Sequence, residues 1–380
     1  MPTGKTIALL VAALVAASAL GFSQRRKERE KEPVTETLEL PPELPAAAVG
    51  ETARLVFDVA PLTTQGLLSR QVRDGLRALL RDARGARILK LRAFVAGSGD
   101  LRRVQEIVAE TFADRRLPLP ALSVIQVGAL PAVGAQVLLE SVAEARKPQN
   151  PHGIAFISGQ VAASAEPTLL VAPLAAQSLA KVRTAVESLG ATPADVLRLT
   201  CYLSSLDDGP KVFQIMFESF RSAALAHMQL RRSYTRGSAE CEAVVRLPAP
   251  VREPVRFLNP DGLEKSPYRS QIALIGAERV VLTGTQMAFH YQDGDVRLAF
   301  ERLGKVLQES GSSYDRVAQA SFYPISMALA DKIWTLGFEF IDKGRPPAST
   351  MAEFEGLPSL EASFAIDVVA ARLGKQSSGS

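Results

Sequence analysis

The chain has 380 residues, of which 47% are hydrophobic and 22% charged, and this composition is typical of a globular protein with a sizeable core. Its formal net charge is +4, from 44 Lys and Arg against 40 Asp and Glu, and much of the excess lies in one N-terminal run. No basic stripe with interleaved aromatic residues is present, so we expect no nucleic-acid partner. The histidines His152, His227 and His290 match no metal-ligand spacing, so we expect neither a metal nor another cofactor.

The N-terminal segment carries two targeting signals that conflict. An uncharged apolar run from Thr6 to Phe22 follows Lys5, and Ala17–Ala19 resembles a signal-peptidase site. A positive run follows directly, and such charge favours retention on the cytoplasmic side. We predict that residues 1–23 are a signal peptide or a transmembrane anchor, with cleavage and sidedness open. The protein is then either membrane-anchored or exported to the periplasm. The positive run comprises Arg25, Arg26, Lys27, Arg29 and Lys31.

Residues 24–50 are charged and then rich in Pro and Ala, which is typical of a linker. The next part of the chain contains a first helix–strand pattern. Its amphipathic and apolar runs predict a helix, a strand, a second helix and two closing strands, which follow an opening strand in each copy of the pattern. These runs are Leu67–Leu80, Ile88–Val95, Leu101–Phe112, Ala121–Val127 and Ala135–Ala143.

The same pattern recurs twice. Leu179–Asp208 and Phe300–Leu329 align at an offset of 121 residues, with Gly190 against Gly311 where each helix should end. The strand at Ile88–Val95 aligns with the second copy at an offset of 108 residues. Further predicted elements are a helix at Lys211–Phe220 and closing strands at Ala239–Leu247, Ala348–Glu355 and Ala362–Leu373. We predict an α+β fold of three units at 51–146, 150–252 and 262–374, with a disordered tail at 375–380.

Cys201 and Cys241 both lie in apolar, strand-like runs of the second unit. We interpret them as small buried hydrophobic residues, because one pair of cysteines is not a disulfide framework and because sequence cannot show the geometry that a disulfide requires.

Several short motifs resemble the RidA/YjgF family, also known as the L-PSP endoribonucleases. They are SPYRSQ at Ser266–Gln271, FISGQV at Phe156–Val161, VLTGTQ at Val281–Gln286 and RPPASTMAEFEGLPSL at Arg345–Leu360. The resemblance implies a chorismate-mutase-like unit, in which a sheet carries two helices on one face. Members of the family form homotrimers with ligand clefts between subunits. Three copies in one chain would form an intramolecular pseudo-trimer, and we expect the chain to be a monomer.

The resemblance also implies a chemistry, the hydrolysis of reactive enamines and imines. In the family an arginine binds the substrate carboxylate and a glutamate on the last strand positions the attacking water. The arginine is absent from all three units, and the glutamate is present only in the second. The arginine position falls on Leu122, on Ala224 or Leu225, and on Ser349. The glutamate position falls on Leu138, Glu240 and Ala365, with Glu140, Glu242 and Asp367 two residues later.

The remaining candidate site residues are few. The resemblance makes Glu240 the candidate catalytic residue and Tyr268, Thr283, Ser158 and Ser349 the candidate binding residues. Each also has a structural interpretation: a packed aromatic ring for the tyrosine, turn chemistry for the hydroxyls and a solvated strand charge for the glutamate. An arginine from a shifted position could still bind a carboxylate, and the nearby arginines are Arg231, Arg232, Arg236 and Arg246.

Three functions are compatible with these residues. The first is a diverged imine or enamine deaminase, a hydrolase acting on a small carboxylate-bearing metabolite. The second is a non-catalytic binding or scaffold protein held at a membrane through the N-terminal segment. The third is an RNA-cleaving enzyme, which the near-neutral charge of the folded part disfavours. An arginine directed into a cleft would support the first function, and apolar clefts would support the second.

Overall fold

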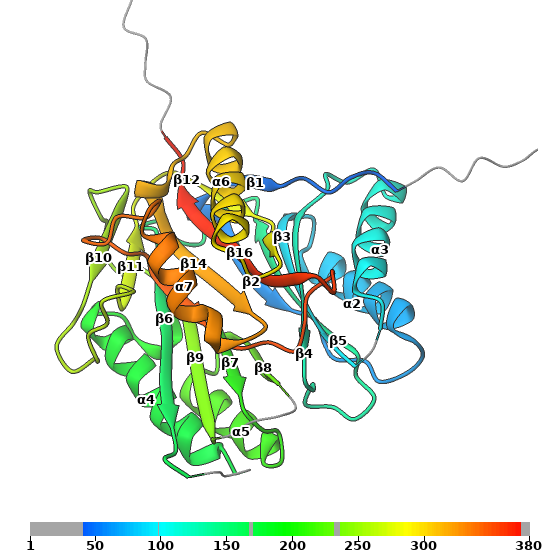
Figure 1. The fold of residues 1–380 in the computed structure, drawn as a ribbon, viewed down its shortest axis with the longest axis horizontal. Helices are drawn as coiled ribbons and strands as arrows, with labels where there is room; N and C mark the ends of the chain where they lie inside the picture. Colours follow the sequence, from blue (N-terminus) through cyan, green and yellow to red (C-terminus); the bar gives the residue numbers. More distant parts are fainter. Residues whose placement is uncertain (1–40, 98, 167–169, 232–235, 374–380) are drawn as a thin grey trace, which may run out of the picture. The chain divides into compact units, whose positions relative to one another are not determined.

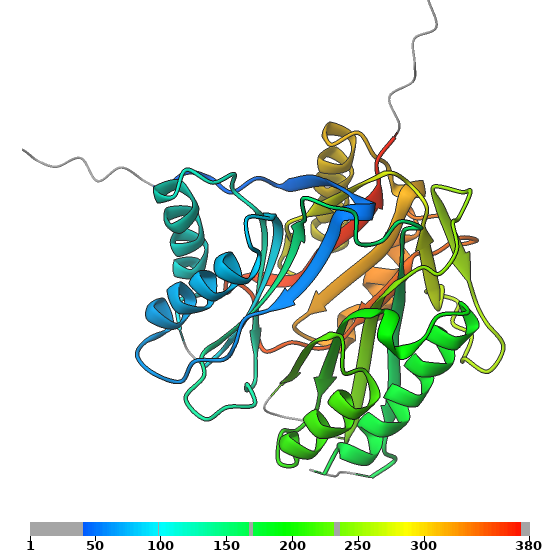
Figure 2. The same ribbon diagram turned by 180° about the vertical axis from the view of Figure 1, so that it is seen from behind.

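Three β-sheets are the framework of this protein (Figures 1 and 2). The computed structural model describes residues 41–97, 99–166, 170–231 and 236–373. The predicted N-terminal targeting segment, residues 1–40 of the chain including most of the predicted linker, and the predicted C-terminal tail lie outside the described residues. No helix within the described ranges is long and apolar enough to cross a membrane.

The first unit forms a four-stranded sheet with strand order β2-β5-β3-β4. Its first strand pairs antiparallel with its last, and its two middle strands pair in parallel across a helical crossover. Both helices have apolar faces that pack on the sheet. The elements are β2 (Leu55–Val59), α2 (Leu68–Asp82), β3 (Arg87–Ala96), α3 (Leu101–Asp114), β4 (Ala121–Val127) and β5 (Val137–Glu144).

The second unit repeats this topology with the order β6-β9-β7-β8. Two further strands extend its sheet beyond β6. The elements are β6 (Ile154–Ala163), α4 (Ala172–Ser188), β7 (Val196–Leu203), α5 (Gly209–Ser219), β8 (Ala224–Gln229), β9 (Ser238–Arg246), β10 (Val255–Leu258) and β11 (Ile272–Ile275).

The third unit has the same topology, with β12 and β13 sharing the place of the first strand beside β16. Its elements are β12 (Arg279–Thr283), β13 (Gln286–Phe289), α6 (Asp293–Glu309), β14 (Val317–Pro324), α7 (Ala330–Gly337), β15 (Ala348–Met351) and β16 (Ala362–Ala371). Short 3-10 turns occur at η1 (Thr52–Arg54), η2 (Pro193–Asp195), η3 (Tyr314–Arg316) and η4 (Met327–Leu329).

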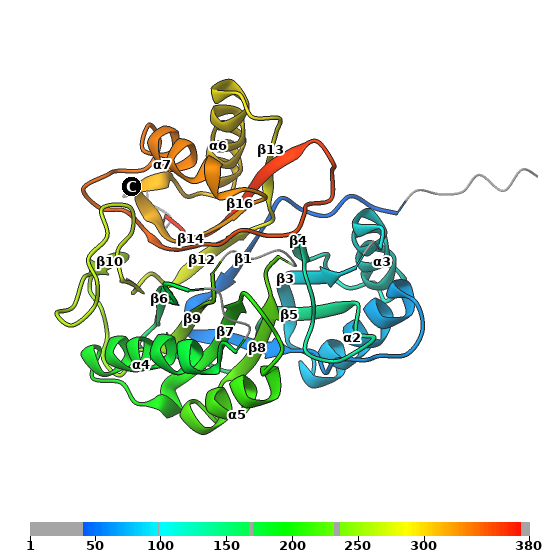
Figure 3. The ribbon, with the colours of Figure 1, turned by 60° about the horizontal axis from the view of Figure 1, so that its bottom comes forward.

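The hydrophobic core is divided between two kinds of layer. Three clusters lie between a sheet and its own two helices. Two further clusters join residues of all three sheets, including Phe57, Phe156 and Leu282 in one cluster and Phe94, Tyr202 and Tyr323 in the other. Each sheet therefore carries helices on one face and packs against the other sheets with its second face (Figure 3). This is the predicted α+β arrangement, and Gly190 and Gly311 have the expected left-handed conformation, with φ of 69° and 76°.

Two sequence-based predictions were wrong. The predicted linker reached residue 50, but β1 (Ala47–Glu51) is a strand that pairs antiparallel with β12 of the third unit. Cys201 and Cys241 are buried as predicted, but they form a disulfide. They face each other on adjacent strands β7 and β9, with their Cα atoms 4.1 Å apart. Sequence patterning could not reveal this pairing because it depends on strand register.

Candidate functional site

Strand register identifies the equivalent positions in the three units. On the last strand of each unit, Glu140, Glu242 and Asp367 face the second strand at Arg92, Thr200 and Ser321. The positions two residues earlier on the same strands are Leu138, Glu240 and Ala365. On the parallel strands, Leu122, Leu225 and Ser349 are equivalent, so Leu225 rather than Ala224 holds this position in the second unit. None of the three is basic.

The motifs FISGQV and VLTGTQ align Ser158 with Thr283 in the sequence, but the strand register does not. Phe156 and Leu282 face equivalent residues, Val244 and Val369, so Ser158 corresponds to Gly284 and not to Thr283. The carbonyl oxygen of Thr283 accepts a hydrogen bond from the Lys90 ammonium group. Thr283 therefore belongs to the contacts at the centre of the molecule, whereas Ser158 lies between the second and third units.

Most of the predicted site residues meet at a buried polar site between the second and third units, beside a pocket that Arg269 lines. We call it the polar cleft and define it by Ser158, Glu240, Arg269 and Ser349. The Ser349 amide donates to Ser158 Oγ over 2.8 Å, and Ser158 Oγ donates to the Ser270 carbonyl oxygen over 2.6 Å. Ser349 Oγ is buried and, among the described residues, lacks a hydrogen-bond partner.

Glu240 is buried in the polar cleft, with 7% of its surface exposed. Arg269 Nη1 donates to its Oε1 atom over 3.4 Å. Burial raises the pKa of Glu240 to about 7, because the opposing charge of Arg269 only partly offsets the loss of water and the negative charge of Glu242 adds to it. Gly159 leaves room for this carboxyl group, since a Cβ atom there would lie 1.9 Å from Glu240 Oε1.

Arg269 was not among the arginines that the sequence analysis proposed, although it follows Tyr268 directly in one of the motifs. Two of the proposed arginines make other contacts. Arg231 pairs with Glu353, and Arg246 donates to Asn150 Oδ1 over 3.4 Å and lines the pocket between the first and second units. Arg232 lies outside the described residues. Arg269 and Tyr268 also line a pocket of about 370 Å³, which includes Gln160, Lys181 and Lys265. Tyr268 stacks on Trp334 with 5.5 Å between ring centroids.

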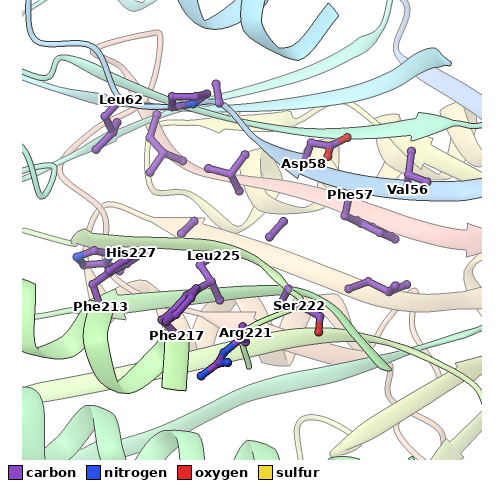
Figure 4. Close-up of a pocket in the computed structure, with 18 of the residues that line it drawn as sticks. Val56, Phe57, Asp58, Leu62, Phe213, Phe217, Arg221, Ser222, Leu225 and His227 are labelled. Carbon is purple, nitrogen blue, oxygen red and sulfur yellow. The ribbon is translucent and has the colours of Figure 1, made fainter. Parts of the chain in front are cut away.

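The cleft between the first and second units is larger and mainly apolar. We call it the apolar cleft; it encloses about 940 Å³ between β2 and β8 (Figure 4). Leu138 and Leu225 line it, at the positions that Glu240 and Ser349 occupy in the polar cleft. Other lining residues are Phe57, Asp58, Leu197, Phe213, Phe217 and Arg221.

His227 also lines the apolar cleft and is 5% exposed. Burial lowers its pKa to about 4, so its ring is neutral at pH 7. The Arg221 guanidinium lies 5.5 Å from the centroid of the Phe217 ring. The cleft can therefore hold an apolar group with some polar contacts, and the part of its lining that the structure describes has no equivalent of the Glu240–Arg269 pair.

The third and first units meet closely at the equivalent place. The Thr285 amide donates to the Leu122 carbonyl oxygen over 3.4 Å. A Cβ atom on Gly284 would lie 2.9 Å from the same oxygen. Ala365 stands at the glutamate position here. The three interfaces of the pseudo-trimer are consequently chemically different: one polar, one open and apolar, and one closed by backbone contact.

Buried charges lie where the three sheets meet. Arg92 contacts Glu140 and Glu242 over 2.5 and 3.0 Å, and Lys90 contacts Asp367 over 3.0 Å. Arg198 completes a cluster of three cations and three carboxylates that belongs to all three units. Burial lowers the pKa of Lys90, and the charge of Asp367 opposes this change. The balanced charges favour a structural role, and within the described residues no three His, Cys, Asp or Glu side chains are grouped as a metal site.

The chain is similar in part to several solved structures of known proteins. No family model and no curated protein matches the chain. A YjgF/YER057c/UK114 family member from Mycobacterium tuberculosis has 17% sequence identity over 24% of this chain and 78% of that chain, with a TM-score of 0.23. A YjgF family member from Neisseria meningitidis has 16% identity over 32% of this chain and 96% of that chain, with a TM-score of 0.24. The Rid family protein YyfB from Yersinia pestis has 19% identity over 31% of this chain and 99% of that chain, with a TM-score of 0.29. Each corresponds to about a third of this chain or less, and each is of the family that the sequence motifs resemble.

Proposed function

We propose that this protein is a non-catalytic binding protein with a RidA-like fold, and that the apolar cleft is its binding site. The main support is the replacement of Glu240 and Ser349 by Leu138 and Leu225 at the equivalent positions of the apolar cleft. A leucine side chain can neither bind a carboxylate nor position a water molecule. A second support is that the carboxylate-binding arginine implied by the family resemblance is absent from all three units.

We also propose that the protein is exported or held at the membrane by residues 1–23. The apolar run and its flanking charges support targeting, and the buried Cys201–Cys241 disulfide supports an oxidising compartment such as the periplasm. Protein isolated from its natural source and alkylated without reduction should have no free thiol. Two alkylated cysteines would contradict export.

The binding function can be tested with the full chain and an apolar fluorescent dye such as Nile red. Ala224 lines the apolar cleft, so Ala224→Trp should fill it and weaken dye binding by about tenfold or more. Val133→Trp is the matched control, because Val133 is fully exposed and lies outside the cleft. Equal dye binding by both variants would show that the apolar cleft is not the binding site.

A second function, imine hydrolysis in the polar cleft, is favoured by one observation. Glu240 has a pKa of about 7 and lies beside Arg269, which could bind the carboxylate of a small metabolite. Freshly generated 2-imino acids should be hydrolysed at the spontaneous rate if the protein is only a binding protein. Faster hydrolysis that Glu240→Gln abolishes and Ala224→Trp preserves would instead establish catalysis in the polar cleft.

A further inference from the structure

The first strands of the three units differ in what covers their outer edges. In the second unit β11 pairs antiparallel with β6, and in the third unit β1 pairs antiparallel with β12. In the first unit β2 is itself the edge strand of its sheet, and no described strand pairs with its outer side. The pseudo-symmetry of the fold therefore leaves one strand position unfilled.

The sequence before β6 explains why no described strand fills this position. Each covering strand immediately precedes the first strand of the next unit: Gly50 lies five residues before Leu55, and Ile275 lies five residues before Val280. The equivalent segment before Ile154 is Arg146–Gln149, which contains Pro148 and is not a strand. Proline cannot donate to a ladder and is disfavoured inside strands.

This segment turns at the beginning of β2 instead of running along it. The amides of Gln149 and Asn150 both donate to the Ala53 carbonyl oxygen, over 2.6 and 2.8 Å. Asn150 Nδ2 donates to the Leu55 carbonyl oxygen over 2.8 Å. Only the first residue of β2 is covered in this way, and the edge from Val56 to Val59 remains without a strand partner in the described structure.

The apolar cleft lies along this edge. Every residue from Leu55 to Leu62 lines it, and so does Leu197 of β7. Figure 4 shows Phe57 and Asp58 across the cleft from Leu225. In the other units the covering strands contact the strands equivalent to β7: β11 contacts β14, and β1 contacts β3. The apolar cleft thus occupies the place where a covering strand would lie. An open strand edge is a template for pairing with another extended segment.

We propose that an extended segment of a partner protein binds in the apolar cleft as an antiparallel strand on the edge of β2. The proposal rests on the binding function given above and specifies its partner. The occupant is argued to be polypeptide because this chain's own strands fill the same position on β6 and β12.

The covering strands also define the side chains that the segment needs. The residue opposite Phe156 is Ala273 and the residue opposite Leu282 is Ala48, so the position opposite Phe57 should be small. The next positions are Leu274 and Ile275 in β11, so apolar residues should follow. The residue after Phe57 on β2 is Asp58, whereas the residue after Phe156 on β6 is Ile157. A basic residue opposite Asp58 would form a favourable cross-strand pair.

The test uses peptides based on residues 270–277 of this chain, SQIALIGA. In SQKALIGA a lysine replaces the residue that would face Asp58, and in SQEALIGA a glutamate does. We expect the full-length protein to bind SQKALIGA more tightly than SQEALIGA by about threefold, and the variant Asp58→Lys to reverse this preference. SQKPPIGA lacks two consecutive amide donors and should bind at least about tenfold more weakly. Hydrogen exchange at the amides of Val56–Val59 should slow when SQKALIGA binds.

Each outcome separates this proposal from the binding function. Dye binding that Ala224→Trp weakens, without binding of any peptide, would overturn the strand proposal and leave the binding function in place. Failure of both dye and peptide would overturn both. Peptide binding without reversal in Asp58→Lys, or without protection of β2, would place the peptide elsewhere and refute the proposal. Self-association that Ala224→Trp abolishes would identify the occupant as a second copy of this chain and overturn the partner assignment.

Discussion

Replacement of Arg92 by methionine should destabilise the protein, because Arg92 links the charges of two units at the centre of the molecule. Arg92 is 4% exposed, and its guanidinium contacts Glu140 and Glu242 over 2.5 and 3.0 Å. Methionine fills much of the same space but leaves both carboxylates without this partner. Removal of one partner from a buried pair typically costs about 3–5 kcal/mol.

The surrounding contacts place Arg92→Met near the lower end of that range. Glu242 keeps Arg198 at 3.3 Å, whereas Glu140 keeps Arg198 only at 4.0 Å and a hydroxyl donor, Thr200, at 2.7 Å. The carboxylate that loses its cation partner is therefore mainly that of Glu140. We expect the free energy of unfolding to fall by about 3 kcal/mol at pH 7, measured by urea denaturation followed by circular dichroism.

The pH dependence gives an independent check. Burial raises the pKa of Glu140, but the charges of Arg92 and Arg198 outweigh burial and hold the pKa below its usual value. This contribution to stability is present above the unfolded pKa of about 4.5 and is lost as the pH falls through the folded value. Without Arg92, burial should raise the pKa of Glu140. The loss of unfolding free energy in Arg92→Met should therefore become smaller as the pH is lowered from 7 to 5.

The control is the double variant Arg92→Met/Glu140→Gln, which removes this unpaired carboxylate. It should be more stable than Arg92→Met alone, because a neutral amide costs less to bury than an unpaired carboxylate. A change of less than about 0.5 kcal/mol in Arg92→Met, or a double variant less stable than the single one, would refute the reasoning.

Three further predictions concern the second unit. Burial raises the pKa of Glu240 to about 7, so ionisation of this group destabilises the protein as the pH rises from about 4.5 through 7. Denaturation from pH 5 to pH 8 should therefore show the free energy of unfolding of Glu240→Gln rising by up to about 3 kcal/mol relative to that of the natural protein. A difference in unfolding free energy that does not change with pH would contradict the raised pKa. Gly159→Ala should destabilise by about 1–3 kcal/mol, since its Cβ atom would lie 1.9 Å from Glu240 Oε1, and Gly159→Ala with Glu240→Ala should recover part of that loss in thermal denaturation. Reduction of the Cys201–Cys241 disulfide, which spans 40 residues, should cost about 4 kcal/mol in the chain-entropy description, and reductant should not change the unfolding of the double alanine variant.

Much of the fold could be predicted from the sequence because it depends on local patterns. Apolar spacing located helices and strands in each of the three units, although it gave no range for β8 or α7. Gly190 and Gly311 end their helices where a left-handed residue is needed. The repeated order of elements also allowed the last strands to be aligned. Glu240, Leu138 and Ala365 are equivalent in the observed register, as the sequence alignment indicated.

The candidate site was less accessible to sequence reasoning because its parts come from different units. Arg269 lies 29 residues from Glu240 along the chain and meets it because the loop between β10 and β11 brings it to β9. The arginines considered from the sequence were close to Glu240 along the chain, and proximity along the chain does not predict contact across an interface.

The sequence by itself determined three similar α+β units, because periodicity and turn residues act within a few residues of one another. Only the tertiary structure decided which unit each edge strand joins: β1 crosses to the third unit and β11 to the second. It also decided that Cys201 and Cys241 meet and that β2 stays open, beside a segment that contains Pro148. Such pairings depend on strand register and on the packing of whole sheets, which the local pattern of a single segment does not encode.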